Sequence, residues 1–373
     1  MALCGRERFA LQLGRDATNT GKPGPRWSCE RVKPQNLMEE TVEPIPLDPI
    51  DSLSVTTLVD NTTDLLIADE GPATRAPLSF SAYPSVPARF LEGDRTSDLL
   101  RAEHGLSCLV TITKSDRTTK ILFDAGVTPD GLVENMRRLE LSPRDIDIIV
   151  LSHGHWDHTT GMDGLVTELG GHAHVPVLIH PEFWSRRRIA LPGRDPIELP
   201  STSKPALEGA GFEIVEQRQP SFLLDGSLLV TGEVDRTTEF EQGFPVHQAH
   251  RDGGWQPDPL ILDDQALVAH VRGRGLVILT GCGHSGIVNI LRYVRKLTGE
   301  SRIHAVIGGF HLGGPLFEKI IAPTCEALDE FSPDYLVPCH CTGWRATHAL
   351  AARLPEAFIQ NSVGTRFEFA SAN

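Results

Sequence analysis

The segment that most constrains this chain is an apolar strand that runs directly into a string of metal-binding side chains. Asp147–Leu151 is almost wholly apolar, which is typical of a strand buried on both faces. The string His153-Gly154-His155-Trp156-Asp157-His158 follows after a single serine. It therefore forms the loop at the carboxyl end of that strand, where α/β enzymes place their chemistry.

The spacing within this loop suits one or two divalent ions. His153 and His155 are two residues apart, so in an extended turn both side chains point the same way. Asp157 and His158 are adjacent, so they diverge and can serve a second metal, while Gly154 allows a tight turn. The alternative is a polar surface loop with coincidental histidines, but four imidazole or carboxylate groups in six positions favour a metal site.

Three further predicted strands also run into turns that carry a histidine. Each of these histidines alone is more simply a hydrogen-bonded core or loop residue. Their shared placement at strand ends favours His284 and His340 as ligands and leaves His311 open. The three segments are Leu276–Leu279 followed by Thr280–Gly286, Tyr335–Val337 followed by Pro338–Gly343, and Ala305–Ile307 followed by Gly308–Gly314.

The rest of the pattern predicts an α/β protein, a four-layer αββα sandwich with two sheets face to face and helices outside. Short apolar or β-branched runs predict many strands, and the apolar spacing predicts helices over about 129–140, 287–297 and 316–331. Residues 1–50 contain proline clusters and no regular period, which predicts a disordered N-terminal extension. A single catalytic domain is predicted over residues 51–373.

Charge and cysteine content narrow the function classes. The 35 Lys and Arg against 49 Asp and Glu give a net charge of −14, which disfavours nucleic acid and anionic membranes as partners. The basic run Arg186–Arg188 is either a solvated helix end or a phosphate-binding rim.

The 7 cysteines show no disulfide-framework spacing. With no membrane-length apolar run and no signal-peptide pattern, we expect a cytoplasmic protein.

Taken together, these motifs resemble the metallo-β-lactamase superfamily from about Val55 to the C-terminus. The string His153–His158 followed by Thr160-Gly161-Met162 resembles its defining motif, and Ile121–Gly126 resembles the strand motif that precedes it. Finer features resemble the dihydropterin-linked branch, named for an archaeal synthase of a methanopterin precursor. These are Leu58–Asn61, His104–Ser107, Thr280–Gly286, Gly308–Leu312 and His340–Gly343.

The resemblance implies an αββα sandwich with the metal site at one edge. By position, His153 and His155 match ligands of one metal, and Asp157 and His158 match ligands of the other. His340 matches the histidine that completes the shell of the second metal.

Two positions depart from the common pattern of the superfamily. Cys282 stands where a bridging carboxylate is usual, and a thiolate there would favour zinc. The alternative is that Cys282 is a bystander, with His284 the true ligand from this turn. Upstream of the strand, Asp263-Asp264 occupies the region where hydrolase members carry a third histidine, so a complete two-metal site is in question.

The leading hypothesis is a metal-dependent hydrolase or group transferase that acts on a small anionic, phosphorylated substrate. Asp157 is the candidate general base or orienting group, and His311, Arg187 and Arg188 are candidates for binding the substrate phosphate. Zinc is the favoured cofactor, with manganese or magnesium as alternatives. A binding or sensing protein on the same fold is the second hypothesis; a nuclease is disfavoured by the acidic charge.

Overall fold

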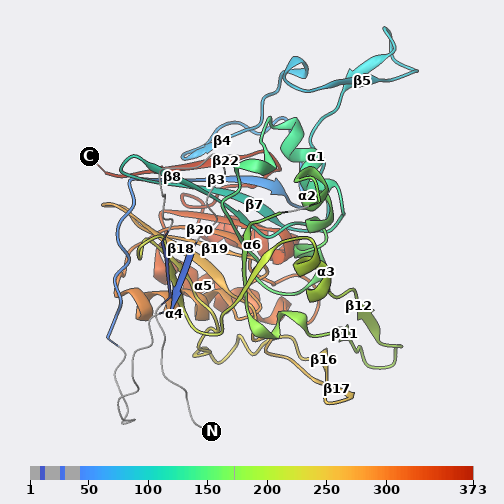
Figure 1. Cartoon of the computed structure of the whole chain (residues 1–373). Helices are drawn as coiled ribbons and strands as arrows, with labels where there is room; N and C mark the ends of the chain where they lie inside the picture. The colour runs from blue at the N-terminus through green and yellow to red at the C-terminus, as the bar shows by residue number, and fades with distance from the viewer. Residues whose placement is uncertain (1–8, 13–25, 30–42, 172, 373) are drawn as a thin grey trace.

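Two β-sheets packed face to face form the centre of the protein (Figure 1). The structure is a computed structural model that describes residues 9–12, 26–29, 43–171 and 173–372. The first sheet has 8 strands in the order β13-β10-β9-β8-β7-β3-β22-β4, and the second has 6 in the order β14-β15-β18-β19-β20-β21. The bounds of the first are β3 Ser52–Val59, β4 Ala73–Thr74, β7 Ser107–Lys114, β8 Arg117–Phe123, β9 Ile148–Val150, β10 Pro176–Ile179, β13 Glu213–Glu216 and β22 Arg366–Ala370. Those of the second are β14 Ser221–Leu223, β15 Leu228–Val230, β18 Ala266–Val271, β19 Gly275–Thr280, β20 Ile303–Gly309 and β21 Tyr335–Cys339.

Helices cover the outer face of each sheet, which confirms the predicted αββα sandwich. The helices α1 (Gly131–Arg138) and α2 (Met162–Glu168) pack their apolar sides against the eight-stranded sheet. The helices α4 (Ile287–Thr298), α5 (Ile321–Phe331) and α6 (Trp344–Arg353) cover the six-stranded sheet. Gly299 ends α4 in the left-handed region, at φ 72°, where a residue with a side chain would be strained.

The apolar core between the sheets explains why the central strands read as continuous hydrophobic runs. Residues from both sheets, among them Val110, Phe123, Leu279 and Ile307, form one buried cluster. All residues of β19 and β20 are buried because one face meets this cluster and the other meets helices. The strands β19, β20 and β21 run parallel, so their carboxyl ends lie at one edge.

A smaller sheet and an arm extend the sandwich. The four-stranded sheet has the order β12-β11-β16-β17, with bounds β11 Arg187–Ile189, β12 Ile197–Leu199, β16 His247–Arg251 and β17 Gly254–Pro257. Arg187 and Arg188 lie on β11 and Arg186 directly precedes it, so the basic run is not at a helix end. The arm, which contains β5 (Ser85–Pro87) and β6 (Arg95–Ser97), projects away from the two large sheets (Figure 1). The remaining helix, α3, spans Lys204–Gly209.

The folded body begins before residue 51, which corrects the predicted boundary. Leu47 and Ile50 are buried, and the Ile50 N–H donates to the His270 carbonyl. The short strands β1 (Phe9–Gln12) and β2 (Arg26–Cys29) pair antiparallel. The rest of the predicted disordered extension lies outside the described residues. Among the described residues, the helices are too short or too polar to cross a membrane.

Candidate metal centre

The candidate metal centre lies where the carboxyl ends of strands from both sheets meet. The loop after β9 supplies His153 to His158, and the turn after β19 supplies Cys282 and His284. His340 follows directly on β21. The structure therefore brings together the seven ligands predicted from sequence, from three loops that are far apart along the chain.

The first ligand group contains His153, His155, Cys282 and His284. The ligand atoms of His153, Cys282 and His284 lie within 4.8 Å of one another. His155 Nδ1 is 3.0 Å from His153 Nε2 and 3.2 Å from His284 Nε2. All four side chains are buried, so their donor atoms converge on a space removed from bulk water.

The second ligand group contains Asp157, His158, Cys282 and His340, again within 4.8 Å of one another. His340 Nε2 is 3.3 Å from Asp157 Oδ2 and 3.4 Å from Cys282 Sγ. His158 Nε2 is 3.3 Å from the same sulfur. Cys282 belongs to both groups, so its sulfur occupies the bridging position between them.

The chemistry of the first group fits a metal ion, because three buried imidazoles turn ring nitrogens toward one another. Burial, and then neighbouring imidazoles, lower the pKa of His153, His155 and His284 well below the ordinary value. These rings are therefore neutral, which is the state that binds metal. His284 Nδ1 has no hydrogen-bond partner although it is buried. A divalent ion placed between these nitrogens would have three neutral imidazole ligands.

Carboxylates set the charge of the second group. Burial alone would lower the pKa of His158, but Asp124 and Asp157 outweigh it and raise the pKa to about 9. Burial would raise the pKa of Asp157, whereas His158 and His340 hold it well below its ordinary value. The second group thus contains an ionised carboxylate, which the first group lacks, and His158 has to release a proton before it can bind a metal ion.

Hydrogen bonds from outside the two groups fix the orientation of the ligands, as is usual at metal sites. Asp124 accepts from the N–H and the hydroxyl of Ser152, and its Oδ2 lies 2.6 Å from His158 Nδ1. Asp60 accepts from the His340 N–H, and Asn61 donates to the His340 carbonyl.

The turn that carries His153 and His155 has no room for a side chain at Gly154. A Cβ at that position would lie 2.1 Å from the Phe183 carbonyl oxygen. The Gly154 N–H donates to Asp263, whose other oxygen accepts from Arg187 at 2.6 Å. Asp263 is thus a support of the first group and not a ligand.

His247 is a candidate ligand that sequence reasoning missed. Its Nε2 lies 3.1 Å from His155 Nε2, and its Nδ1 faces the Asp258 carbonyl at 2.9 Å. The residue comes from β16 of the small sheet and is fully buried. No strand end or glycine turn marks it in the sequence, so only the tertiary fold reveals it.

The three predicted phosphate contacts have different surroundings. His311 is half-buried, and its ring lies 4.1 Å from that of His284, beside the centre. Arg187 is buried behind the metal-binding loop, where it pairs with Asp263. Arg188 lies away from the groups, with its guanidinium 4.5 Å from the Trp255 ring. Of these three residues, the structure brings only His311 to the ligand groups, where a ring nitrogen lies within 4.8 Å of the sulfurs of Cys282 and Cys341.

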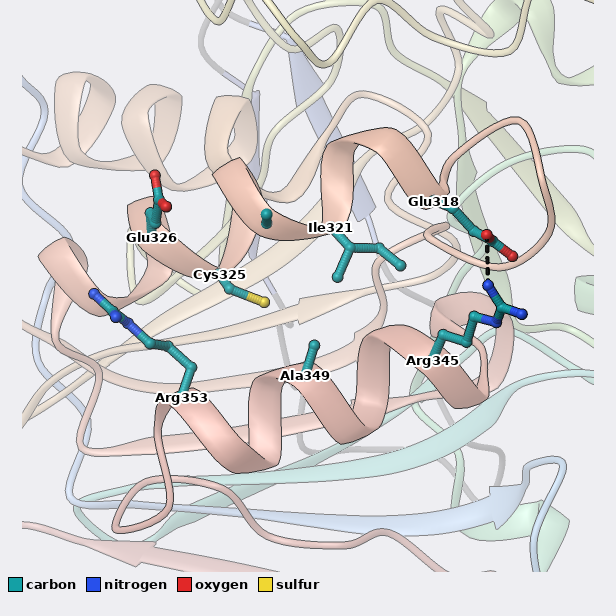
Figure 2. A pocket seen from close by; sticks show the side chains of 8 residues that line it. Glu318, Ile321, Cys325, Glu326, Arg345, Ala349 and Arg353 are labelled. Carbon is teal, nitrogen blue, oxygen red and sulfur yellow. Dashed lines mark hydrogen bonds and ion pairs between the residues drawn. The ribbon is translucent and has the colours of Figure 1, made fainter.

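A groove elsewhere on the surface has no part in this centre. It lies between α5 and α6, has a volume of about 440 Å³ and is lined by residues such as Ile321, Cys325 and Ala349 (Figure 2). Glu318 and Arg345 close one end with an ion pair of 2.8 Å. The groove shares no lining residue with the two ligand groups.

Comparisons with known proteins agree with this geometry. Residues 104–295 match the metallo-beta-lactamase superfamily. The chain is 31% identical over 278 residues to the 7,8-dihydropterin-6-methyl-4-(beta-D-ribofuranosyl)-aminobenzene-5'-phosphate synthase of Methanocaldococcus jannaschii, covering 72% of this chain and 90% of that one. It is 34% identical over 255 residues to an uncharacterized protein of the same organism, covering 67% of this chain and 88% of the relative.

A solved structure shares the fold. It is Tm1679, described as a metal-dependent hydrolase of the beta-lactamase superfamily. The TM-score is 0.63 at 23% identity, over 86% of this chain and 100% of that one.

Proposed function

Because the chain belongs to the metallo-β-lactamase superfamily, we propose that it is a metal-dependent hydrolase or group transferase whose substrate is a small phosphorylated molecule. The observation that carries the proposal is the pair of ligand groups that share Cys282 at the strand ends. The synthase from M. jannaschii has a 5'-phosphate in its name, which supports a phosphorylated substrate.

In this proposal, His153, His155 and His284 hold one ion, with His247 beside them, and Asp157, His158 and His340 hold a second. A divalent ion supplies Lewis acidity for attack on an ester or anhydride bond. Cys282 Sγ reaches both groups, and a soft sulfur ligand favours zinc over magnesium or manganese.

The residues of the chain have separate tasks in the reaction. Asp157 Oδ2 accepts hydrogen bonds and orients the attacking group. His104 Nε2 lies 3.9 Å from that oxygen, and its side chain is 62% exposed, so it can pass a proton to solvent. Burial is the main cause that lowers the pKa of His104, which keeps the ring available as a proton acceptor. His311 contacts the substrate from the other side of the centre.

Elemental analysis and a substrate screen test the proposal. Protein purified without added metal should retain zinc, and the screen should include phosphomonoesters, phosphodiesters, thioesters and lactones. We expect turnover of phosphoesters that a chelator abolishes and added zinc restores. Protein that retains no metal, or turnover that is indifferent to the chelator, would contradict the proposal. Turnover only with a second organic substrate would identify a transferase.

A further inference from the structure

A hollow of about 450 Å³ adjoins the centre on the far side of His340. It lies between the loop after β3, the end of β21, the first turns of α6 and the segment 358–361. Its volume is in the range of cavities that enclose a small organic ligand. None of the residues described above as metal ligands lines it except His340.

One wall of the hollow is an aromatic shelf on α6. Trp344 is 79% exposed, which leaves a large apolar ring in water. His348, one helical turn later, meets it edge to face with ring centroids 4.2 Å apart. This contact leaves most of the indole surface exposed, so the indole offers a flat face for a second ring. Stacking of this kind is a common way to bind planar rings.

The lining of the hollow also includes polar side chains. The amide-bearing residues Asn61 and Gln360 line it, and they offer both donors and acceptors. Asp60 is buried, and its two oxygens accept from the His340 N–H and from Asn361. Among the described lining residues there is no lysine or arginine. The described lining therefore lacks the cationic side chains that most often bind a phosphate, and it suits a neutral group.

The hollow and the metal centre share one imidazole. His340 Nε2 faces Cys282 and Asp157 in the second ligand group. Its Nδ1 lies 3.4 Å from Asn61 Oδ1, on the side of the hollow. A ligand in the hollow is thus separated from the reacting centre by the width of a single ring.

From these contacts we infer that the hollow is a substrate subsite for a neutral, planar aromatic ring with a hydrogen-bonding edge, stacked on Trp344. The ring's edge meets the amides of Asn61 and Gln360. The phosphorylated end of the substrate then lies toward the ligand groups. The inference rests on the proposed function for the identity of that phosphorylated end, but ring binding is measurable without turnover.

Calorimetric titration of the metal-loaded full chain tests the subsite. The probes are 4-quinazolinone, which is planar, neutral and has an amide edge, and δ-valerolactam, which has the same edge without an aromatic ring. We expect the first to bind and the second to bind at least about 10-fold more weakly, because stacking supplies most of the affinity. Equal binding of the two probes, or no binding of 4-quinazolinone at millimolar concentration, would overturn the inference.

Three variants localise the binding. Trp344→Ala should weaken 4-quinazolinone by about 10-fold or more, while Trp344→Phe should keep most of the affinity. Ala351→Leu should fill the hollow and weaken binding without removing the shelf. The matched control is Phe90→Ala, since Phe90 lies between β5 and β6, is 89% exposed and does not line the hollow.

The metal content of every variant should equal that of the parent protein. An unchanged dissociation constant in both Trp344→Ala and Ala351→Leu would overturn the subsite.

Kinetics separates this inference from the proposed function. If the parent enzyme turns over phosphoesters, Trp344→Ala should raise KM for an aryl-bearing phosphoester and leave KM for glycerol phosphate unchanged. Equal KM changes for both substrates would contradict the subsite but would not contradict the proposed function. If no phosphoester is turned over while the binding pattern holds, the proposed function fails and the subsite stands.

Discussion

The two ligand groups share one sulfur but differ in charge and in how they are held. The first group is made of neutral imidazoles, whose pKa values burial lowers. The second contains the ionised Asp157 and a His158 whose pKa the carboxylates raise to about 9. A group of neutral imidazole ligands suits a borderline ion such as zinc. A group that includes a carboxylate ligand also binds harder ions.

The supports differ in the same way. Asp124 binds His158 directly and reaches His153 only through Ser152. Asp263 serves the first group alone, through the Gly154 N–H and Arg187. In the proposed two-ion centre, this difference predicts that one ion can be lost without the other, because Asp263 supports the first group and Asp60 supports His340 of the second.

The largest effect expected is loss of one ion through a single ligand. His155→Ala should remove the first ion and reduce turnover by about 100-fold or more, because it deletes the imidazole whose Nδ1 lies against both His153 and His284. His340→Ala is the matched variant and should remove the second ion only. Elemental analysis checks both, with circular dichroism to show that the fold persists. Full metal occupancy in His155→Ala would contradict the prediction that the first group can lose its ion separately from the second.

Replacing the shared sulfur should affect both ions at once. Cys282→Ala removes the bridging ligand, so we expect the affinity for both ions to fall by about 10- to 100-fold. Cys282→Asp should restore binding and shift preference toward manganese, since a carboxylate is a harder ligand. Competition between zinc and manganese, followed by elemental analysis, measures the shift.

Loss of a single ion in Cys282→Ala would show that the sulfur serves one group only. Burial, and then the hydrogen bond with Cys341, raise the pKa of Cys282 well above that of a free thiol. Alkylation after metal removal is therefore expected to be slow, and metal competition is the sharper readout.

Substitution of His247 tests whether the first group needs a ligand from the four-stranded sheet. If its Nε2 is a ligand, His247→Ala should lower affinity for the first ion by about 10-fold or more and leave the second unchanged. His250→Ala is the control, because His250 lies on the same strand and contacts Trp255 edge to face instead of the ligand groups. Identical zinc affinities in the two variants would confine His247 to a structural role.

The fold and most of the centre could be predicted because strand ends are visible in sequence. Buried parallel strands are continuous apolar runs, so the residues after β9, β19 and β21 could be placed at one edge. The motif residues from His153 to His158 follow this rule. So do Cys282 and His340.

Three features could not be predicted, each because it depends on packing between distant segments. His247 reaches the centre from a strand whose pairing with β11 sets its position. Arg187 is in the basic run, but its burial depends on the partner Asp263, 76 residues later. Ile50 follows a proline-rich stretch, yet it packs into the core through contacts with β18.

The smallest effect should come from the support of the first group. Asp263→Asn keeps an oxygen that can accept from the Gly154 N–H but removes the charge that Arg187 meets. Because the turn then loses part of its anchor, we expect affinity for the first ion to fall by about 10-fold, with the second ion unaffected. Thermal unfolding should also shift downward, since a buried arginine without its partner is destabilising by about 3 kcal/mol or more.

The double variant Asp263→Asn with Arg187→Met separates these two effects, because it removes the unpaired charge and leaves the weakened anchor. Recovered thermal stability with a persistent loss of the first ion would assign Asp263 to positioning of His153 and His155. Equal loss of both ions in the single variant would show that the two groups respond as one unit, and the comparison between them would fail.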